Sequence, residues 1–321
     1  MFIEKGDKSK NFGLKYLLGF VIITVFYILG QFPLGIALVI NSFKTGAVVP
    51  TTEEAIMKVF SPNVTLFLML LIFVFTMIGI IIVVKYLHKL KMLDVTTSRE
   101  KVDWKRIFFS FSLWSLFTIF STVVFYYSTP ESFVLNFKPI PFLILLLISF
   151  TMLPIQTSTE EYIFRGYLMQ GLGLITKTRW FPLIVTSSLF GLMHIMNPEV
   201  EKMGYIILVY YIGTGFFLGI ITLMDEGMEL ALGFHAANNI VTALLVTTDW
   251  SALKTDSILK DVSLPSAGFE ILVPVLIIFP ALLFIFSKKY NWSNWKEKLT
   301  GTIEIKKLEP TQIFSIEMKP V

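Results

Sequence analysis

Three short groups of polar and ionisable residues interrupt apolar stretches in the second half of this chain. An ionised side chain in the hydrocarbon region of a membrane costs about 2.5–3.5 kcal/mol on insertion scales, so residues of this kind usually have a function. Two glutamates, an arginine, two histidines and an amide could together activate water and stabilise an oxyanion, which is the chemistry of hydrolysis. The groups are Glu160-Glu161-x-x-x-Arg165, Phe190-x-x-x-His194 and His235-x-x-x-Asn239.

The first group contains one acid that can pair within its own helix and one that cannot. In a helix, Glu161 and Arg165 are at i and i+4, in the acid-first order that favours an ion pair. Glu160 is rotated by about 100° around the same helix, which leaves its carboxylate for another partner. The alternative is that both acids belong to one buried structural cluster. Pro154, earlier in the same segment, predicts a kink that frees a backbone carbonyl.

Glu160 and His194 are predicted to lie at a similar depth. The run 177–179 contains two basic residues and marks the turn between two antiparallel helices. Glu160 is 18 residues before Thr178, and His194 is 16 residues after it. Since the helical rise per residue is constant, the two side chains should differ in height by about 3 Å. A carboxylate and an imidazole that face each other can share and activate a water molecule, whereas a lone histidine would more often be a satisfied core residue.

The third group presents two hydrogen-bond donors on one helix face. His235 and Asn239 are at i and i+4, and such a pair suits the oxyanion that forms on a peptide carbonyl. The alternative is hydrogen bonding between helices, which is common for asparagine and histidine in membranes. Asn238 is the neighbouring candidate, but it points away from the face of His235.

Membrane helices must position these groups, because the composition is that of a polytopic membrane protein. The 321 residues are 55% hydrophobic and only 16% charged, with a mean hydropathy of +0.72, whereas soluble domains carry about 25% charged residues. Runs long enough to span a bilayer predict an all-α fold, a bundle of about eight transmembrane helices with the catalytic core in helices four to seven. The helices are predicted near 16–41, 65–87, 107–127, 140–165, 181–197, 204–224, 230–248 and 268–287.

The same runs divide the chain into three parts. Residues 1–139 contain the first three helices and their loops, residues 140–250 the catalytic membrane core, and residues 251–321 the last helix and a cytoplasmic tail. The basic N-terminus superficially resembles a signal peptide, but its apolar run is too long and no small-residue cleavage site follows, so we expect a retained first span. Gly215 and Gly219 form a G-x-x-x-G pair that predicts close packing of helix six.

Alternate loops are rich in lysine and arginine. The segment 85–106, the tail after 287 and the loop after helix four are basic, whereas the loops between them hold few basic residues. The positive-inside rule therefore places both termini in the cytoplasm. It also explains the net charge of +4 without a nucleic-acid partner. The loop with Asp225, Glu226 and Glu229 is acidic where a basic loop is expected, but the rule counts only lysine and arginine.

The remaining histidine and several missing motifs exclude other chemistry. His88 stands at a basic membrane edge, where we expect a solvated residue without a role in the site. Cysteine is absent, which removes disulfides, thiolate metal ligands and a cysteine nucleophile. The sequence has no His-Glu-x-x-His zinc motif, no G-x-S-x-G, no Gly-x-Gly-Asp run, no Walker-type loop and no dinucleotide fingerprint.

The three groups, in this order and each on its own helix, resemble the motifs of the CAAX-protease and bacteriocin-processing family of intramembrane proteases. The matching motifs are Glu160-Glu161-x-x-x-Arg165, Phe190-x-x-x-His194 and His235-x-x-x-Asn239, together with the continuation Arg165-Gly166-Tyr167-Leu168. The resemblance covers about residues 155–240 of the sequence. The first three helices and the tail carry no family signature.

The resemblance implies an all-helical membrane endopeptidase with an active-site cavity open to the cytoplasmic side. It implies that Glu160 and His194 activate water and that His235 and Asn239 stabilise the oxyanion. The catalytic residues would then be Glu160, His194, His235 and Asn239, supported structurally by Glu161, Arg165 and Phe190.

A metal-dependent version of the same hydrolysis is the alternative. Glu160, His194 and His235 could hold Zn²⁺ with one open position, and accounts of the family differ on whether a divalent metal takes part. His235, paired with Asn239, fits the polarisation of an amide equally well. We therefore expect glutamate catalysis without a cofactor.

Two other functions fit membrane helices with glutamate and histidine. A proton-coupled transporter uses such chains as proton relays, but transporters often show inverted repeats, and the sequence shows no repeat. A non-catalytic immunity or assembly protein could keep the fold, since the family includes members linked to bacteriocin self-protection. The protease hypothesis predicts a peptide or membrane-protein substrate. The lysine-rich, cysteine-free composition favours a bacterial cell membrane.

Overall fold

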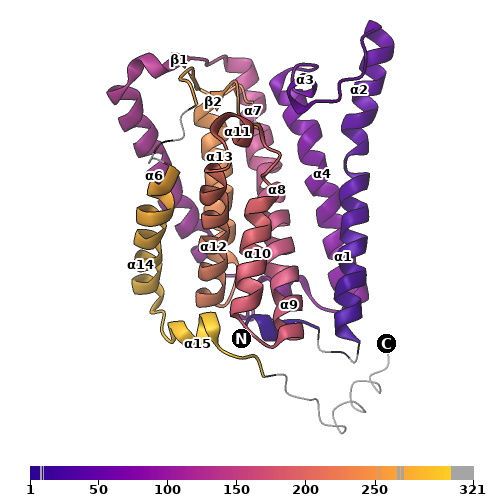
Figure 1. Cartoon of the computed structure of the whole chain (residues 1–321), viewed down its shortest axis with the longest axis vertical. Coiled ribbons are helices and arrows are strands. Elements are labelled where there is room, and N and C mark those ends of the chain that lie inside the picture. The colour runs from indigo at the N-terminus through magenta and orange to yellow at the C-terminus, as the bar shows by residue number, and fades with distance from the viewer. Residues whose placement is uncertain (8, 10, 253, 266–267, 269–270, 305–321) are drawn as a thin grey trace.

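Helices account for most of the chain, because a backbone inside a bilayer must satisfy its own hydrogen bonds. The computed structural model describes residues 1–304 except 8, 10, 253, 266–267 and 269–270. Residues 305–321 of the predicted tail lie outside the described residues. The all-α prediction is confirmed, and the helices are arranged as a bundle whose long axes run in the same general direction (Figure 1).

Five helical stretches among the described residues are long and apolar enough to cross a membrane. They are Phe12–Thr45, Pro62–Leu87, Trp104–Ser128, Pro139–Thr176 and Ile207–Asp225. The other three predicted segments, near 181–197, 230–248 and 268–287, also coincide with helices, but these are shorter. The number of spans therefore stays a prediction.

Breaks and tighter or wider turns divide these stretches into shorter elements. The α-helices are α1 (Phe12–Leu29), α2 (Phe32–Thr45), α3 (Glu53–Ile56), α4 (Pro62–Ile82), α5 (Met92–Thr96), α6 (Trp104–Ser128), α7 (Pro139–Thr151), α8 (Leu153–Glu161), α9 (Met169–Thr176), α10 (Trp180–Leu192), α11 (Pro198–Met203), α12 (Ile207–Asp225), α13 (Glu229–Leu245), α14 (Phe279–Tyr290) and α15 (Trp295–Thr300). Wider π-helical turns occupy Val83–Leu87, Tyr162–Leu168 and Pro274–Ile278.

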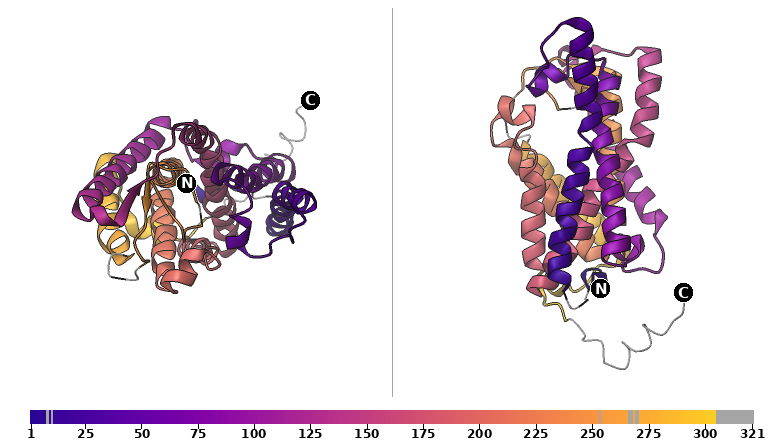
Figure 2. Two further views of the ribbon diagram at one scale, coloured as in Figure 1. Left: turned by 90° about the horizontal axis from the view of Figure 1, so that it is seen from above. Right: turned by 90° about the vertical axis from the view of Figure 1, so that its right-hand side faces the viewer.

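Helix α13 lies inside the bundle and contacts α8, which carries the two glutamates. It packs against α6, α8 and α12, while α10 packs against α12 and α4 packs against α8. Seen from above, α1, α2 and α4 form one side of the molecule, at the right of the left-hand view (Figure 2). The core 139–245 is therefore flanked by the N-terminal helices and by α6.

A small three-stranded sheet, which the sequence did not predict, covers one end of the bundle. It consists of β1 (Phe133–Leu135), β2 (Val246–Thr248) and β3 (Leu259–Asp261). Strand β3 is central, antiparallel to β1 and parallel to β2. Since β2 directly follows α13, the sheet fixes the end of that helix to the loop after α6. Figure 1 shows it at the end of the bundle opposite to α9, α15 and the N-terminus.

The predicted close packing of Gly215 and Gly219 is confirmed. A Cβ at Gly215 would collide with the backbone carbonyl of Ser187 on α10, and a Cβ at Gly219 would collide with the side chain of Leu183. Small residues let two helix backbones approach closely in a membrane. Helices α10 and α12 consequently cross with their backbones in direct contact at Gly215.

The acidic loop between α12 and α13 lies beside the basic segment that follows α4. Arg99 contacts both Asp225 and Glu229 at 3.0 Å, and Arg106 pairs with Asp225 as well. Opposite charges at such distances attract each other. The two loops therefore share one end of the bundle, which resolves the mismatch between this acidic loop and its basic neighbours.

The prediction that His88 is a solvated residue was wrong. His88 is 5% exposed, with Nδ1 3.0 Å from Asp7 Oδ2 and Nε2 3.0 Å from the hydroxyl of Tyr167. The reason is that the N-terminal segment folds against the end of the bundle, where Phe2 and Ile3 are buried in the core. A burial of this kind depends on contacts between residues about 80 positions apart, which hydropathy along the chain does not reveal.

Candidate active site

The helix that carries the two glutamates is interrupted on both sides of them. Helix α7 ends at Thr151, and α8 begins at Leu153 with Pro154 in its first turn. The helix is therefore interrupted near Pro154, where the sequence predicted a kink, and the freed backbone carbonyl stays a prediction. The π-helical turn Tyr162–Leu168 follows Glu161 directly. Such wide turns occur frequently at functional sites, because they change the direction of the side chains that follow.

Glu161 and Arg165 form a fully buried ion pair. Arg165 Nη1 lies 3.1 Å from Glu161 Oε1, and both side chains are 0% exposed. Arg165 Nη2 donates to the carbonyl oxygen of Gly215 at 3.0 Å, which the close approach of α12 brings within reach. The guanidinium also lies over the ring of Phe190, 4.4 Å from its centroid, an arrangement that favours a cation. These contacts fix Arg165 from three sides.

His235 lies between the two glutamates. Its Nδ1 is 2.8 Å from Glu161 Oε1, and its Nε2 is 3.5 Å from Glu160 Oε2. Because an ionised carboxylate only accepts hydrogen bonds, Nδ1 is the donor to Glu161. That bond fixes the ring and directs Nε2 toward Glu160, as the partner of the first ring nitrogen usually does for a functional histidine.

Glu160 differs from Glu161 in that its side chain is partly exposed. Its Oε1 accepts a hydrogen bond of 2.7 Å from Gln156 Nε2, and its side chain is 13% exposed. Oε2 faces His235 at a distance longer than a normal hydrogen bond. The carboxylate that does not pair with Arg165 is thus held by Gln156 on its own helix and faces a histidine of α13.

His194 is placed after the end of α10 rather than on it. The helix ends at Leu192, and His194 lies in the turn that follows. Its Nδ1 is 2.9 Å from the carbonyl oxygen of Phe190. Since a carbonyl only accepts, Nδ1 carries the proton in this bond, which leaves Nε2 as the nitrogen that can accept one. The ring stacks on Tyr211 with centroids 4.3 Å apart.

Phe190 joins the three sequence motifs. Its ring centroid is 5.3 Å from that of His194 and 5.8 Å from that of His235, and it supports Arg165. Between Glu160 and His194, by contrast, no hydrogen bond or ion pair is found in the part of the chain that the structure describes. The predicted water shared by these two side chains stays a prediction. The direct neighbour of Glu160 is His235.

Asn239 contacts two residues that the sequence analysis did not select. Its Nδ2 donates to Gln156 Oε1 at 2.8 Å, and its Oδ1 accepts from Asn238 Nδ2 at 3.0 Å. Asn238 in turn accepts a hydrogen bond of 3.1 Å from Trp114 Nε1. Gln156 could have been found as a polar residue one helical turn before Glu160. Trp114 gave no comparable signal, because a tryptophan in an apolar helix is ordinary.

The residues expected to hold zinc in the alternative mechanism are not assembled for it. Glu160 and His235 are neighbours, but the contacts of His194 are with Phe190 and Tyr211. Within the described residues, no three histidine, aspartate or glutamate side chains form a group that could hold a metal ion. In this arrangement the three side chains do not form one metal-binding group.

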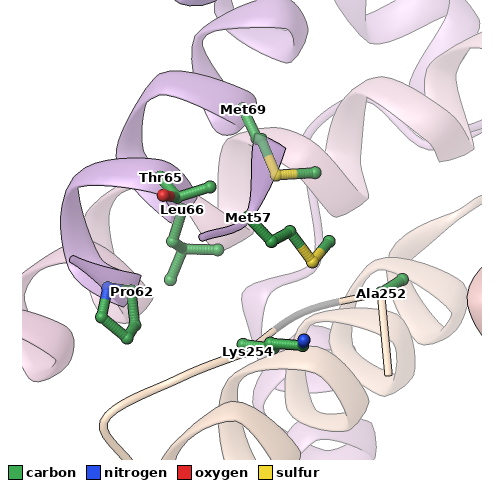
Figure 3. A pocket seen from close by; sticks show the side chains of 7 residues that line it. All are labelled: Met57, Pro62, Thr65, Leu66, Met69, Ala252 and Lys254. Carbon is green, nitrogen blue, oxygen red and sulfur yellow. The ribbon is translucent and has the colours of Figure 1, made fainter. Parts of the chain in front are cut away.

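A small pocket elsewhere in the molecule has no part in this site. It is lined by residues of the start of α4 and of the segment after β2, among them Thr65, Met69 and Lys254 (Figure 3). Its volume of about 10 Å³ corresponds to a single water molecule. It contains none of the residues of the three motifs.

Comparison with known proteins agrees with the motifs. A family model described as type II CAAX prenyl endopeptidase Rce1-like matches residues 139–241, which contain all three groups. The chain is also 30% identical over 234 residues to the uncharacterized protein YyaK of Bacillus subtilis (strain 168), covering 73% of this chain and 78% of the relative. No solved structure matches the chain. The resemblance seen in the motifs is confirmed, and the chain belongs to the Rce1-like family of type II CAAX prenyl endopeptidases, as an integral membrane protein.

Proposed function

We propose that this protein is an intramembrane endopeptidase in which Glu160 activates the water that attacks a peptide bond. The observation that carries the proposal is the difference between the two adjacent acids. Glu161 is 0% exposed and is held by Arg165 and His235, whereas Glu160 is partly exposed with one oxygen toward His235. A general base must reach its proton donor, and of the two acids Glu160 has the partly exposed side chain.

In this mechanism the water lies near Glu160 Oε2. Glu160 takes one proton as the water oxygen forms a bond to the peptide carbonyl carbon. His194, with Nδ1 bonded to Phe190, offers Nε2 as a second acceptor for the attacking water. The carbonyl oxygen becomes an oxyanion, and Asn239 Nδ2–H stabilises it together with His235 Nε2–H, for which His235 must carry a proton on each ring nitrogen. The carbon–nitrogen bond then breaks, and the proton held by Glu160 passes to the leaving amine.

The supporting residues have a separate role in the proposal. Arg165 neutralises Glu161, so that Glu161 orients His235 without acting as a second base. Phe190 keeps Arg165 and the two histidine rings in place. Preorganised donors and bases are worth most where water is largely excluded, as in the interior of this bundle.

The family description makes a prenylated C-terminal CAAX peptide the first substrate class to test. The second class is an unmodified peptide or membrane protein. The relative from Bacillus subtilis supports a bacterial cell membrane as the location. We place the end with α9, α15 and the N-terminus on the cytoplasmic side, as the basic loops predict.

The test uses the purified full chain in proteoliposomes with a farnesylated CAAX peptide and its unmodified counterpart. We expect release of the C-terminal peptide by the wild type and loss of release with Glu160→Gln. Glu201→Gln, a matched change at an exposed acid of α11, should leave release intact. Equal release by the wild type and Glu160→Gln would contradict the role of Glu160. Solute uptake by sealed vesicles without cleavage of either peptide would favour a transporter.

Metal dependence is tested on the same proteoliposomes. We expect turnover to survive dialysis against a strong chelator, and the purified protein to contain less than stoichiometric zinc. Loss of turnover on dialysis that zinc restores would show that a metal takes part, and would point to a rearrangement of His194 toward Glu160.

A further inference from the structure

Glu160 is the end of a chain of four side-chain hydrogen bonds that begins at Trp114. Trp114 Nε1 donates to Asn238 Oδ1 at 3.1 Å, and Asn238 Nδ2 donates to Asn239 Oδ1 at 3.0 Å. Asn239 Nδ2 donates to Gln156 Oε1 at 2.8 Å, and Gln156 Nε2 donates to Glu160 Oε1 at 2.7 Å. The five residues, which we call the amide relay, come from helices α6, α13 and α8.

The two ends of the amide relay determine the orientation of every amide between them. An indole N–H can only donate, and an ionised carboxylate can only accept. The assignment of oxygen and nitrogen in a single asparagine or glutamine is often ambiguous. Here, Trp114 requires Asn238 Oδ1 to face it, and Glu160 requires Gln156 Nε2 to face it. Both requirements give the same direction through Asn239, so all four bonds point toward Glu160.

A chain of bonds with one direction has a physical consequence at its acceptor end. Hydrogen bonds in series polarise one another, most strongly in surroundings of low dielectric. Gln156 is 8% exposed and Trp114 is 6% exposed, whereas Asn238, Asn239 and Glu160 are partly buried, so water has limited access to the relay. The last bond, to a carboxylate, belongs to the strong charge-assisted class. The relay therefore holds Glu160 Oε1 and leaves Oε2 directed toward His235.

We propose that Gln156 is a positioning residue of this site, and that Trp114 and Asn238 set its orientation. Gln156 connects the proposed base Glu160 to the proposed oxyanion donor Asn239, so one side chain sets the geometry of both. Asn239 uses one N–H toward Gln156 and keeps its second N–H for the substrate. This inference rests on the proposed role of Glu160, and its tests below separate the two.

The first test is the hydrolysis of the farnesylated CAAX peptide by variants of the relay. Gln156→Met keeps the length of the side chain and removes both hydrogen bonds. We expect it to lower kcat by about 10- to 100-fold, the range of one hydrogen bond to a charged group, with KM nearly unchanged. Gln31→Met, the same change in the exposed break between α1 and α2, should have no effect. A merely structural role would lower the amount of folded protein and leave kcat per folded molecule unchanged.

The second test is a double-mutant cycle at the distant end. Trp114→Phe and Asn238→Leu each break the relay before it reaches Gln156, and we expect each to lower kcat by about 3- to 10-fold. Because both interrupt the same chain, the double variant should be no slower than Asn238→Leu alone. Effects that multiply would overturn the relay. Trp104→Phe, an indole removed from the exposed start of the same helix, serves as the control.

The third test does not depend on activity. The chain has six tryptophans, and their indole signals can be followed by NMR after ¹⁵N-tryptophan labelling in lipid nanodiscs. We expect Gln156→Met to shift the Trp114 indole signal, although two amides separate the residues, and Gln31→Met to leave it in place. An unchanged Trp114 signal would overturn the relay even in an active enzyme. A shifted signal in a protein that cleaves no peptide would support the relay and contradict the proposed function instead.

Discussion

Two buried histidines of this protein have similar first partners and different second partners. His235 Nδ1 lies 2.8 Å from Glu161, and His88 Nδ1 lies 3.0 Å from Asp7. Each ring is thus oriented by a carboxylate. His88 Nε2, however, is 3.0 Å from the hydroxyl of Tyr167, whereas His235 Nε2 is 3.5 Å from the partly exposed Glu160. One ring has a hydrogen-bond partner at both nitrogens, and the other has one nitrogen directed toward a partly exposed carboxylate.

The surroundings of the two histidines also differ. The carboxylate of Asp7 is shared by Ser9, Lys15 and His88. Buried polar atoms without a hydrogen-bond partner among the described residues occur in both clusters, at Ser9 Oγ near His88 and at Glu161 Oε2 and Arg165 Nε near His235, so they do not separate the two. The difference lies in Glu160, whose side chain is partly exposed beside His235. We propose on this ground that the His88 cluster is structural and that the His235 cluster carries the reaction.

Both clusters depend on one helical stretch. Tyr167 lies in the π-helical turn that begins directly after Glu161, and its hydroxyl also lies 2.9 Å from the carbonyl oxygen of Tyr16 on α1. The same stretch that carries the two acids is therefore fixed at its other end by the N-terminal segment and α1. The His88 cluster therefore helps to fix the position of the helical stretch from which Glu160 and Glu161 project.

The largest expected effect is on turnover, and it is expected in the His235 cluster, which contains Glu160. Glu160→Gln keeps size and shape but removes the base, so turnover should fall by about 10²- to 10⁴-fold. The thermal unfolding midpoint of the purified protein should stay near that of the wild type. A large loss of stability with unchanged turnover per folded molecule would contradict this. It would show that Glu160 has a structural role, like His88.

The next largest effect is on stability and arises at the buried ion pair. Arg165→Met leaves Glu161 charged and buried without its partner, and breaking a buried pair in this way costs about 3–5 kcal/mol. We expect a strong decrease in the yield of folded, membrane-inserted protein, measured by fluorescence-detected gel filtration. The double variant Glu161→Gln/Arg165→Met should recover part of that yield, because it leaves no unpaired charge. Recovery of yield without recovery of turnover would separate the fold from the orientation of His235.

A smaller effect, on stability, is expected in the His88 cluster. His88→Leu removes one hydrogen bond from each of Asp7 and Tyr167, a loss of about 1–3 kcal/mol for buried groups left unpaired. The midpoint of thermal unfolding should fall, while kcat per folded molecule stays within about twofold of the wild type, as expected for a residue outside the chemistry. A fall in kcat as large as that of Glu160→Gln would contradict a structural role.

The smallest effect is a dependence of stability on pH. Burial lowers the pKa of His88 below its usual value, although the neighbouring Asp7 carboxylate opposes this shift. Burial acts to raise the pKa of Asp7, but hydrogen bonds from Ser9 and His88 outweigh it and lower that pKa. Both groups thus bind protons more readily in the unfolded chain, so stability rises with pH.

The pH window of this effect follows from the two residue types. The contribution of His88 is present above about pH 6.5 and is lost as the pH falls below it, and that of Asp7 is lost below about pH 3.9. We expect the unfolding midpoint to decrease between pH 7 and pH 5, and the decrease to be smaller in His88→Gln. A steeper decrease in that variant would show that other groups determine the acid sensitivity.

The sequence predicted what depends on residues close together along the chain. Apolar runs predicted the helical segments because the length of a span is a local property. The spacing of Glu161 and Arg165 predicted their ion pair, and Gly215 and Gly219 predicted a close helix crossing. The three motifs together identified the family.

Two of the features that sequence reasoning missed depend on contacts between distant segments, and two others depend on short or irregular local structure. The burial of His88 requires the N-terminal segment, and the orientation of Gln156 requires residues of α6 and α13. The predicted helix 181–197 was too long, because apolar residues continue beyond Leu192, where α10 ends. His194 consequently lies in the turn after the helix. The strands β1, β2 and β3 have three residues each, too few to give a period that could be recognised.

The central claim is that Glu160 catalyses hydrolysis of a peptide bond, and its most direct test is a comparison of peptide termini. Membranes from cells that carry the wild type or Glu160→Gln, at matched abundance, would be analysed for new protein termini by mass spectrometry. The account predicts termini that are present only with the wild type, and these would also identify the substrate. Identical termini in both samples, with both proteins folded and abundant, would contradict it.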